Sequence, residues 1–107
     1  MKKRNVIKNY SEFKEILDLR KFKKDYLFTV YYRNNNYGKT RVGILIRKIN
    51  GIAVRRNLIK RQIRSIIDST IDYKHSKDFI IVISKNYNPC EYKLNEERLS
   101  KILHEIY

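Results

Sequence analysis

The sequence has 107 residues, enough for one compact domain with its own core, and we expect that single domain to span residues 1–107. Hydrophobic residues make up 42% of the chain, which excludes a disordered basic tail. The formal net charge is +14, from 25 Lys and Arg against 11 Asp and Glu. A charge this large on so small a domain attracts polyanions: nucleic acid, an acidic membrane surface or an acidic protein.

The first predicted element is a helix over residues 11–22, after a basic segment (1–10) for which we expect no regular structure. Ser11 is a good N-cap for this helix. Four residues then follow at helical spacing along one stripe: Phe13, Ile16, Leu17 and Arg20.

Two strands follow, over residues 26–33 and 40–48, because both segments are rich in β-branched and aromatic residues. Alternate side chains of a strand point to opposite faces. One face of each strand is apolar: Tyr26, Phe28, Val30 and Tyr32, then Val42, Ile44 and Ile46. The other face contains arginine: Leu27, Thr29, Tyr31 and Arg33, then Arg41, Gly43, Leu45 and Arg47. The pattern predicts two neighbouring strands of a sheet that has a core side and a basic side.

The segment around Asn50-Gly51 allows two interpretations. The pair is a strong type I′ turn signal, which favours a hairpin. However, four isoleucines follow at i, i+4, i+7 and i+8: Ile59, Ile63, Ile66 and Ile67. Four polar residues occupy the opposite side at i, i+3, i+4 and i+7: Asn57, Lys60, Arg61 and Arg64. A strand would distribute both sets over two faces, so we predict a helix over about residues 52–69, entered through Asn50-Gly51.

The last elements are a buried strand over residues 77–84 and a helix capped by Asn95. The core stripe of that helix is Leu99, Ile102, Leu103 and Ile106. The residues themselves give the order α-β-β-α-β-α, with room for one more strand from dividing the middle of the chain. The fold class is α+β, with helices packed on the apolar face of a small sheet.

The charge is concentrated in the middle of the chain. No acidic residue occurs from Tyr26 to Ile67, whereas ten basic residues do. Arginine dominates between Arg41 and Arg64, and its planar guanidinium matches phosphate and stacks on bases in a way that lysine cannot. Cationic groups at one-turn spacing on a helix match phosphates along a backbone, so this helix predicts a phosphate-lined partner.

Cysteine content and the N-terminus indicate the compartment. Cys90 is the single cysteine, so no internal disulfide can form, which fits a reducing cytoplasm. The basic start is not followed by the apolar segment of a secretory signal, and no apolar run approaches the ~18 residues of a membrane span. We therefore expect a cytoplasmic protein.

The pattern K-x-x-G-x-A-V-x-R-N-x-x-K-R-x-x-R, from Lys48 to Arg64, resembles the signature of the bacterial ribonuclease P protein component. Arg41-Val42-Gly43 stands where that family has R-V-G in a strand, and the N-terminal K-K-R-N with Phe13 also resembles the family. The resemblance implies the order α-β-β-β-α-β-α with a left-handed βαβ crossover, the arrangement of the second domain of ribosomal protein S5. It covers nearly the whole chain and is strongest over residues 41–64.

The resemblance also implies a function: the protein subunit of an endoribonuclease whose RNA subunit removes the 5′ leader of precursor tRNA. Mg²⁺ would be bound mainly by that RNA and by the substrate, and no obligate protein partner or membrane would be involved. The residues expected to bind the catalytic RNA are Lys48, Arg55, Arg56, Asn57, Lys60, Arg61 and Arg64. Those expected in the leader-binding cleft are Phe13, Leu17, Tyr31, Arg41 and Arg47. The resemblance implies no catalytic residue and no metal ligand on the protein.

The sequence departs from the family pattern at several positions. Leu17 stands where an aromatic is common, Ile49 and Leu58 replace frequent bases, and Ile52 replaces a frequent Asn, while Arg55 adds a charge. Simpler interpretations also stay open: Phe13 and Leu17 as core, Tyr31 as an ordinary sheet tyrosine, and Arg41 and Arg47 as solvated strand residues.

Three other classes of protein compete with this interpretation. A ribosomal-type RNA- or DNA-binding module would show the same basic face without the signature pattern. A protein nuclease acting alone needs clustered carboxylates or a His-based acid–base pair, which the acid-free window disfavours. A basic amphipathic membrane helix would need the apolar stripe that the core uses.

Overall fold

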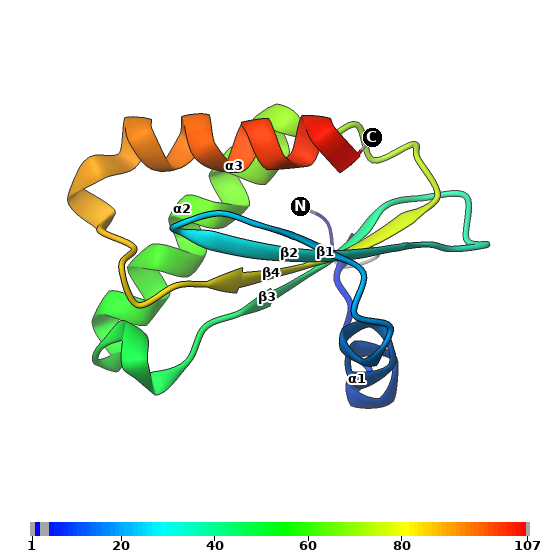
Figure 1. The fold of residues 1–107 in the computed structure, drawn as a ribbon, viewed down its shortest axis with the longest axis horizontal. Coiled ribbons are helices and arrows are strands. Elements are labelled where there is room, and N and C mark those ends of the chain that lie inside the picture. The colour runs from blue at the N-terminus through cyan, green and yellow to red at the C-terminus, as the bar shows by residue number, and fades with distance from the viewer. Residues whose placement is uncertain (1, 3–4, 107) are drawn as a thin grey trace.

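The computed structural model describes residue 2 and residues 5–106 of the chain (Figure 1). Its helices and strands are α1 (Tyr10–Asp18), β1 (Phe22–Lys24), β2 (Phe28–Asn34), β3 (Arg41–Leu45), α2 (Ala53–Thr70), β4 (Lys77–Ile83) and α3 (Tyr92–Ile106). Two short 3-10 turns, η2 (Lys48–Asn50) and η3 (Pro89–Glu91), precede α2 and α3. The order α-β-β-β-α-β-α is confirmed, but the additional strand is β1, before the other strands. The prediction that it divides the middle of the chain was wrong.

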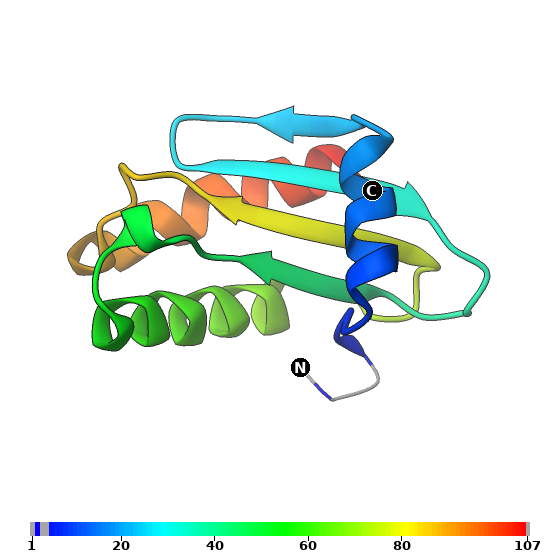
Figure 2. The ribbon, with the colours of Figure 1, turned by 90° about the horizontal axis from the view of Figure 1, so that it is seen from below.

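The four strands form one mixed sheet in the order β1-β2-β4-β3. β2 is antiparallel to both β1 and β4, whereas β3 is parallel to β4. The two strands predicted as neighbours, β2 and β3, are therefore separated by β4. The β3–α2–β4 connection crosses in the left-handed sense (Figure 2), against the strong right-handed preference of such units.

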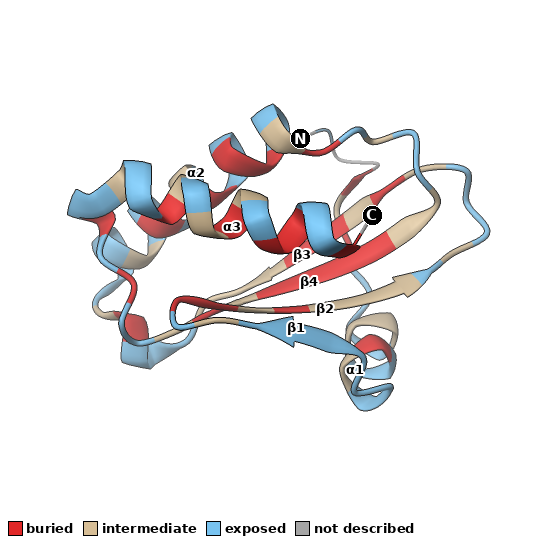
Figure 3. Cartoon of the chain, turned by 45° about the horizontal axis from the view of Figure 1, so that its top comes forward, coloured by how far each residue is buried: buried red, intermediate tan, exposed pale blue. Residues whose placement is uncertain are grey.

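The core lies between the sheet and the two helices α2 and α3 (Figure 3). The predicted apolar faces supply Phe28, Val30 and Val42, and β4 adds Phe79, Ile81 and Ile83. The four isoleucines of α2 are fully buried against this face: Ile59, Ile63, Ile66 and Ile67. The helix over about residues 52–69 is confirmed, because only a 3.6-residue period places all four on one side.

Helix α1 lies on the opposite face of the sheet, so only α2 and α3 follow the expectation that the helices pack on its apolar face (Figure 1). Ile16 of α1 is buried with Ile7 and Ile80 in a second, smaller core. The Phe13 ring lies directly over Gly43 of β3, so close that a Cβ at that glycine would overlap it. The absence of a side chain at Gly43 therefore allows α1 to lie against the sheet.

The boundaries of α1 differ from the prediction. Its N-cap is Asn9, whose side-chain oxygen accepts a hydrogen bond from the Ser11 N–H at 2.8 Å. The helix ends at Asp18, because Arg20 adopts the left-handed conformation at φ 53°. The residues after it form β1, and Asp25 closes the hairpin to β2 by accepting the Leu27 and Phe28 N–H groups at 2.7 and 3.0 Å.

The start of α3 also differs from the prediction. Asn95 is not a cap: it is buried in the first turns of the helix and donates to the Asn88 carbonyl at 2.8 Å. Asn88 instead caps the turn η3 by accepting from the Cys90 N–H at 3.0 Å, with Pro89 next. Pro89 fits that first turn because its missing N–H has no partner there in any case.

Substituting Gly43 by Ala should destabilise the protein by about 1–3 kcal/mol, because the new methyl group displaces the Phe13 ring from the sheet. Urea unfolding of the two proteins measures the difference in the free energy of unfolding. In a Phe13→Ala background the same Gly43→Ala change should have a much smaller effect. Equal effects in both backgrounds would contradict this account of how α1 is seated.

Candidate nucleic-acid interface

The solvent-facing side of α2 presents the predicted basic row. Asn57, Lys60, Arg61 and Arg64 are all exposed, while the isoleucines of the same helix are buried. The first acidic residue of this helix is Asp68, near its C-terminal end. Most of the length of α2 therefore offers cationic and amide groups to a partner, at the spacing predicted from the sequence.

Arg55 and Arg56 differ from the rest of the row. Arg55 folds back over Gly51 and donates from Nη2 to the Tyr87 carbonyl oxygen at 3.4 Å. Arg56 is only partly exposed, and its Nε is shielded from solvent without a hydrogen-bond partner within the described part of the chain. Arg61, which is exposed, is therefore the better position to test.

A buried asparagine fixes the turn that leads into α2. The Asn50 side chain donates to the Ser84 carbonyl at 2.9 Å and accepts from the Arg47 N–H at 3.0 Å, which ties η2 to the end of β4. Gly51 follows at φ 108°, in the region that favours glycine. Lys48 is exposed on this turn, next to the start of the basic row.

A cleft of about 450 Å³ opens on the face of the sheet that α2 and α3 do not cover. Its lining includes Lys24, Thr29, Tyr31, Arg47, Val82 and Asn86. Helix α1 crosses the same face (Figure 2), so this cleft is the part of the face that α1 leaves open. Arg47 borders the cleft while donating to the Ile83 carbonyl at 3.2 Å, which restrains its guanidinium there.

Tyr31, which borders this cleft, contacts an aromatic residue that the sequence did not single out. The rings of Tyr31 and Phe22 lie with their centroids 5.2 Å apart and tilted by 46°, and Phe22 is 45% exposed. Phe22 was assigned to the end of the first helix; in the structure it pairs with Tyr31 across the β1–β2 ladder. The Asp25 turn signal could have indicated the hairpin that brings the two rings together.

The guanidinium of Arg41 is not free on the open face of the sheet. Its guanidinium binds the fully buried carboxylate of Asp78 at 2.9 and 3.0 Å and Glu12 of α1 at 2.6 Å, with the Tyr37 ring over it at 4.1 Å. Arg33 joins the same cluster, binding Asp78 at 2.9 Å and Glu15 at 3.2 Å. Arg41 thus connects β3 to β4 and α1 through ion pairs within the protein.

This cluster brings acidic groups onto a face that the sequence suggested was free of them. Asp78, Glu12 and Glu15 lie outside residues 26–67 in the sequence but reach the arginines of β2 and β3 in the fold. Burial alone raises the pKa of Asp78, but hydrogen bonds from Arg41, Asn35 and Arg33 outweigh burial and hold that pKa below its ordinary value. The hydrogen bond between Arg41 and Asp78 also raises the pKa of the Arg41 guanidinium.

Phe13 and Leu17 lie in the interface between α1 and the sheet. Both are partly buried and pack against the small core of Ile7, Ile16 and Ile80. Tyr31 packs against the same core, at the junction between α1 and the cleft. The structure therefore gives Phe13 and Leu17 a packing role, and of these three residues Tyr31 also borders the open cleft.

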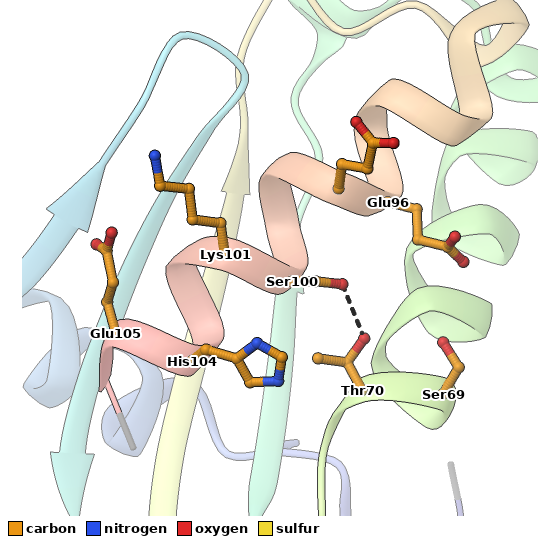
Figure 4. A pocket seen from close by; sticks show the side chains of 8 residues that line it. Ser69, Thr70, Glu96, Ser100, Lys101, His104 and Glu105 are labelled. Carbon is orange, nitrogen blue, oxygen red and sulfur yellow. Dashed lines mark hydrogen bonds between the residues drawn. The ribbon is translucent and has the colours of Figure 1, made fainter.

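A second groove, of about 840 Å³, lies between α3 and the C-terminal end of α2 (Figure 4). Thr70 and Ser100 bridge its walls through a 3.1 Å contact between their hydroxyl oxygens. Glu96, Glu97 and Glu105 line it, so its charge opposes phosphate. The basic row of α2 and the cleft on the open face are therefore the surfaces suited to a polyanion.

Two further properties concern the described residues, 2 and 5–106. No group of three or more His, Cys, Asp or Glu side chains among them is arranged to hold a metal ion. None of the helices in that part of the chain combines the length and apolar character needed to cross a bilayer.

Comparison with known proteins gives a consistent result. The family profile described as Ribonuclease P matches residues 1–107. The ribonuclease P protein component of Mycoplasma mycoides is 38% identical over 108 aligned positions, covering 99% of both chains. The solved ribonuclease P protein of Staphylococcus aureus is 28% identical, with a TM-score of 0.78 over 95% of this chain and 94% of that one. The protein from Thermotoga maritima, at 23% identity, shares the fold with a TM-score of 0.72 over 94% of this chain and 93% of that one.

A small mixed sheet, a left-handed crossover and a solvent-facing cationic helix define a class of basic α+β proteins suited to polyanions. Within that class, the match over the full chain is decisive. The chain belongs to the ribonuclease P protein family.

Replacing Asp78 by Asn should lower the free energy of unfolding at pH 7 by about 3 kcal/mol, because Arg33 and Arg41 lose their buried counter-charge. The depressed pKa of Asp78 also predicts a pH dependence: its stabilisation is present above the unfolded pKa of about 3.9 and is lost as the pH falls through the folded value. Urea unfolding between pH 7 and pH 3 should therefore show a smaller acid-induced loss in the variant. If the wild type and the variant lost the same stability between pH 7 and pH 3, the carboxylate of Asp78 would not be the cause of the pH dependence.

Proposed function

We propose that this chain is the protein subunit of ribonuclease P and binds the catalytic RNA through the basic row of α2. The observation that carries the proposal is the exposed set Asn57, Lys60, Arg61 and Arg64 on a helix whose opposite side is fixed by four buried isoleucines. A helix held in this way presents its cations at fixed one-turn spacing, so a phosphate backbone can bind without reorganising the protein. Membership of the family supports the same assignment.

In this proposal the RNA subunit performs the cleavage and the protein lowers the electrostatic repulsion between catalytic RNA and precursor tRNA. Each cation of the row neutralises a phosphate and releases a counterion, which favours assembly. Mg²⁺ held by the RNA and the substrate would stabilise the charge that develops at the scissile phosphate. Asp78, Glu12 and Glu15 are engaged by arginine, and Asp25 at the border of the cleft accepts from the Leu27 and Phe28 N–H groups and pairs with Arg98. This fits metal ligands supplied by the RNA.

The cleft on the open face is the proposed site of the 5′ leader. Tyr31 offers a ring for stacking on an unpaired base, an interaction of roughly 1–3 kcal/mol. Lys24 and Arg47 at the border of the cleft offer charge to the leader phosphates. Arg41 is left out of this set, because its guanidinium is taken up by Asp78 and Glu12.

Reconstitution tests the proposal: at low Mg²⁺, protein mixed with ribonuclease P RNA should cleave precursor tRNA at the 5′ side, whereas neither component should do so alone. Neutralising about three phosphates, one for each cation of the row, predicts a log–log salt dependence of binding with a slope of roughly −2.1 to −2.7. Arg61→Ala should make the slope shallower by about 0.7–0.9. Filter binding at a series of KCl concentrations measures both quantities.

Lys101→Ala on α3 is the matched control, since Lys101 is exposed but borders the acidic groove. It should leave the slope nearly unchanged. Cleavage by the protein alone would reveal an active site on the chain. Tight RNA binding without any cleavage in the mixture would instead favour a ribosomal-type binding module.

Tyr31→Ala should weaken binding of precursor tRNA by roughly 5- to 150-fold when the leader has several nucleotides, because the stacking surface is lost. The same variant should bind normally a substrate whose leader has a single nucleotide. Tyr31→Phe keeps the ring and should behave like the wild type. Equal losses with both leader lengths would mean that Tyr31 acts through the fold and not through the leader.

A further inference from the structure

Four large apolar side chains are exposed at the entrance to α2. Ile49 is 58% exposed, Ile52 74%, Val54 75% and Leu58 39%. All four lie within ten consecutive residues, in the turn η2 and the first turns of the helix. We call this set the apolar tip; it lies at the end of the molecule where β3 leads into α2 (Figure 2).

The apolar tip continues into the basic row. Val54, Leu58 and Arg61 fall at i, i+4 and i+7, so they follow one another along a single stripe of α2. Arg61 is exposed on that stripe, and Lys48 is exposed on the turn that also holds Ile49. A partner that covers Arg61 therefore also reaches the apolar side chains next to it.

Isoleucine at position 52 is unfavourable for the stability of α2. It is the N-cap of α2 and makes no side-chain hydrogen bond to the helix. Asn, Asp and Ser are preferred at this position, because their side chains accept from the free N–H groups of the first turn. Nor does Ile52 gain from burial, since most of its side chain is exposed. Ile52 thus neither caps nor packs in the free protein, which leaves its side chain available to a partner.

We propose that unpaired bases of the catalytic RNA pack against the apolar tip, beside the phosphates bound by the basic row. This inference rests on the proposed function. The charge of the surroundings selects the partner: Lys48, Lys60 and Arg61 are exposed on the same turn and helix as the apolar tip, so the surface fits a polyanion. Unpaired nucleotides are the parts of RNA that join apolar faces to phosphates, and flipped-out bases do stack on apolar side chains.

The two kinds of contact differ in their response to salt. Loss of a phosphate contact changes the slope of log Kd against log salt concentration, because a counterion is no longer released. Loss of an apolar contact weakens binding equally at every salt concentration and leaves the slope unchanged. Salt titration of variants therefore distinguishes base packing from a second set of phosphate contacts.

The experiment measures binding of the full chain to the ribonuclease P RNA encoded in the same genome, over a series of KCl concentrations. Ile52→Asn and Leu58→Gln should each weaken binding by about 5- to 30-fold with an unchanged slope. Ile52→Asn should at the same time raise the Tm by roughly 4–8 °C, because it supplies the missing cap. A more stable protein that binds less tightly cannot be explained by misfolding.

Two comparison variants complete the design. Arg61→Gln should change the slope, which reports a phosphate contact in the same assay. Leu94→Gln removes an apolar side chain of matching exposure, 41% against 39% for Leu58, from α3 and should bind like the wild type. Unpaired bases that the wild type protects from dimethyl sulfate should become reactive in the Ile52→Asn complex.

Each outcome decides the inference. Parallel loss of affinity in Ile52→Asn and Leu58→Gln, with renewed base reactivity, supports it. Wild-type affinity in both variants, with a changed slope in Arg61→Gln, would leave the proposed function intact and overturn the apolar contact, pointing to a protein partner for the tip. Failure of the wild type to bind this RNA would overturn the proposed function and the inference together.

Discussion

The buried carboxylate of Asp78 is the interaction on which the arrangement of this protein depends. It lies on the central strand β4 and accepts hydrogen bonds from Arg33 of β2, Arg41 of β3 and Asn35 after β2. Through the same arginines it is connected to Glu12 and Glu15 of α1. A single anion thus joins three strands and a helix in a chain with a net charge of +14, where neighbouring cations would otherwise repel one another.

This arrangement divides the arginines into two groups with different consequences. Those of β2 and β3 are neutralised inside the protein, so they hold α1 on the sheet and have little left to offer to a partner. Arg61 and Arg64 of α2 remain in solvent, on the side of the helix opposite the buried isoleucines. Charge density in the sequence therefore overstates the surface that is available to a polyanion.

The sequence predicted α2 and its two faces well, because four isoleucines at a 3.6-residue period leave one solution for a helix of this length. It missed β1, since Phe22–Lys24 is short, exposed throughout and directly follows a helix, so no alternation is visible. The sequence did not reveal the internal ion pair of Arg41, because its partner Asp78 is 37 residues away in the chain. Local sequence patterns contain no information on such distant pairs. The contact of Phe22 with Tyr31 was missed for the same reason, because it depends on the hairpin.

The central position of β4 has a consequence for synthesis of the protein on the ribosome. β4 pairs with both β2 and β3, yet it is the last strand to be made. The nascent chain therefore exposes the basic segment that becomes α2 before the sheet that orients it can close. We expect nascent chains that lack residues 77–83 to hold these cations without a fixed geometry, so that orderly recognition begins only when the C-terminal quarter has emerged.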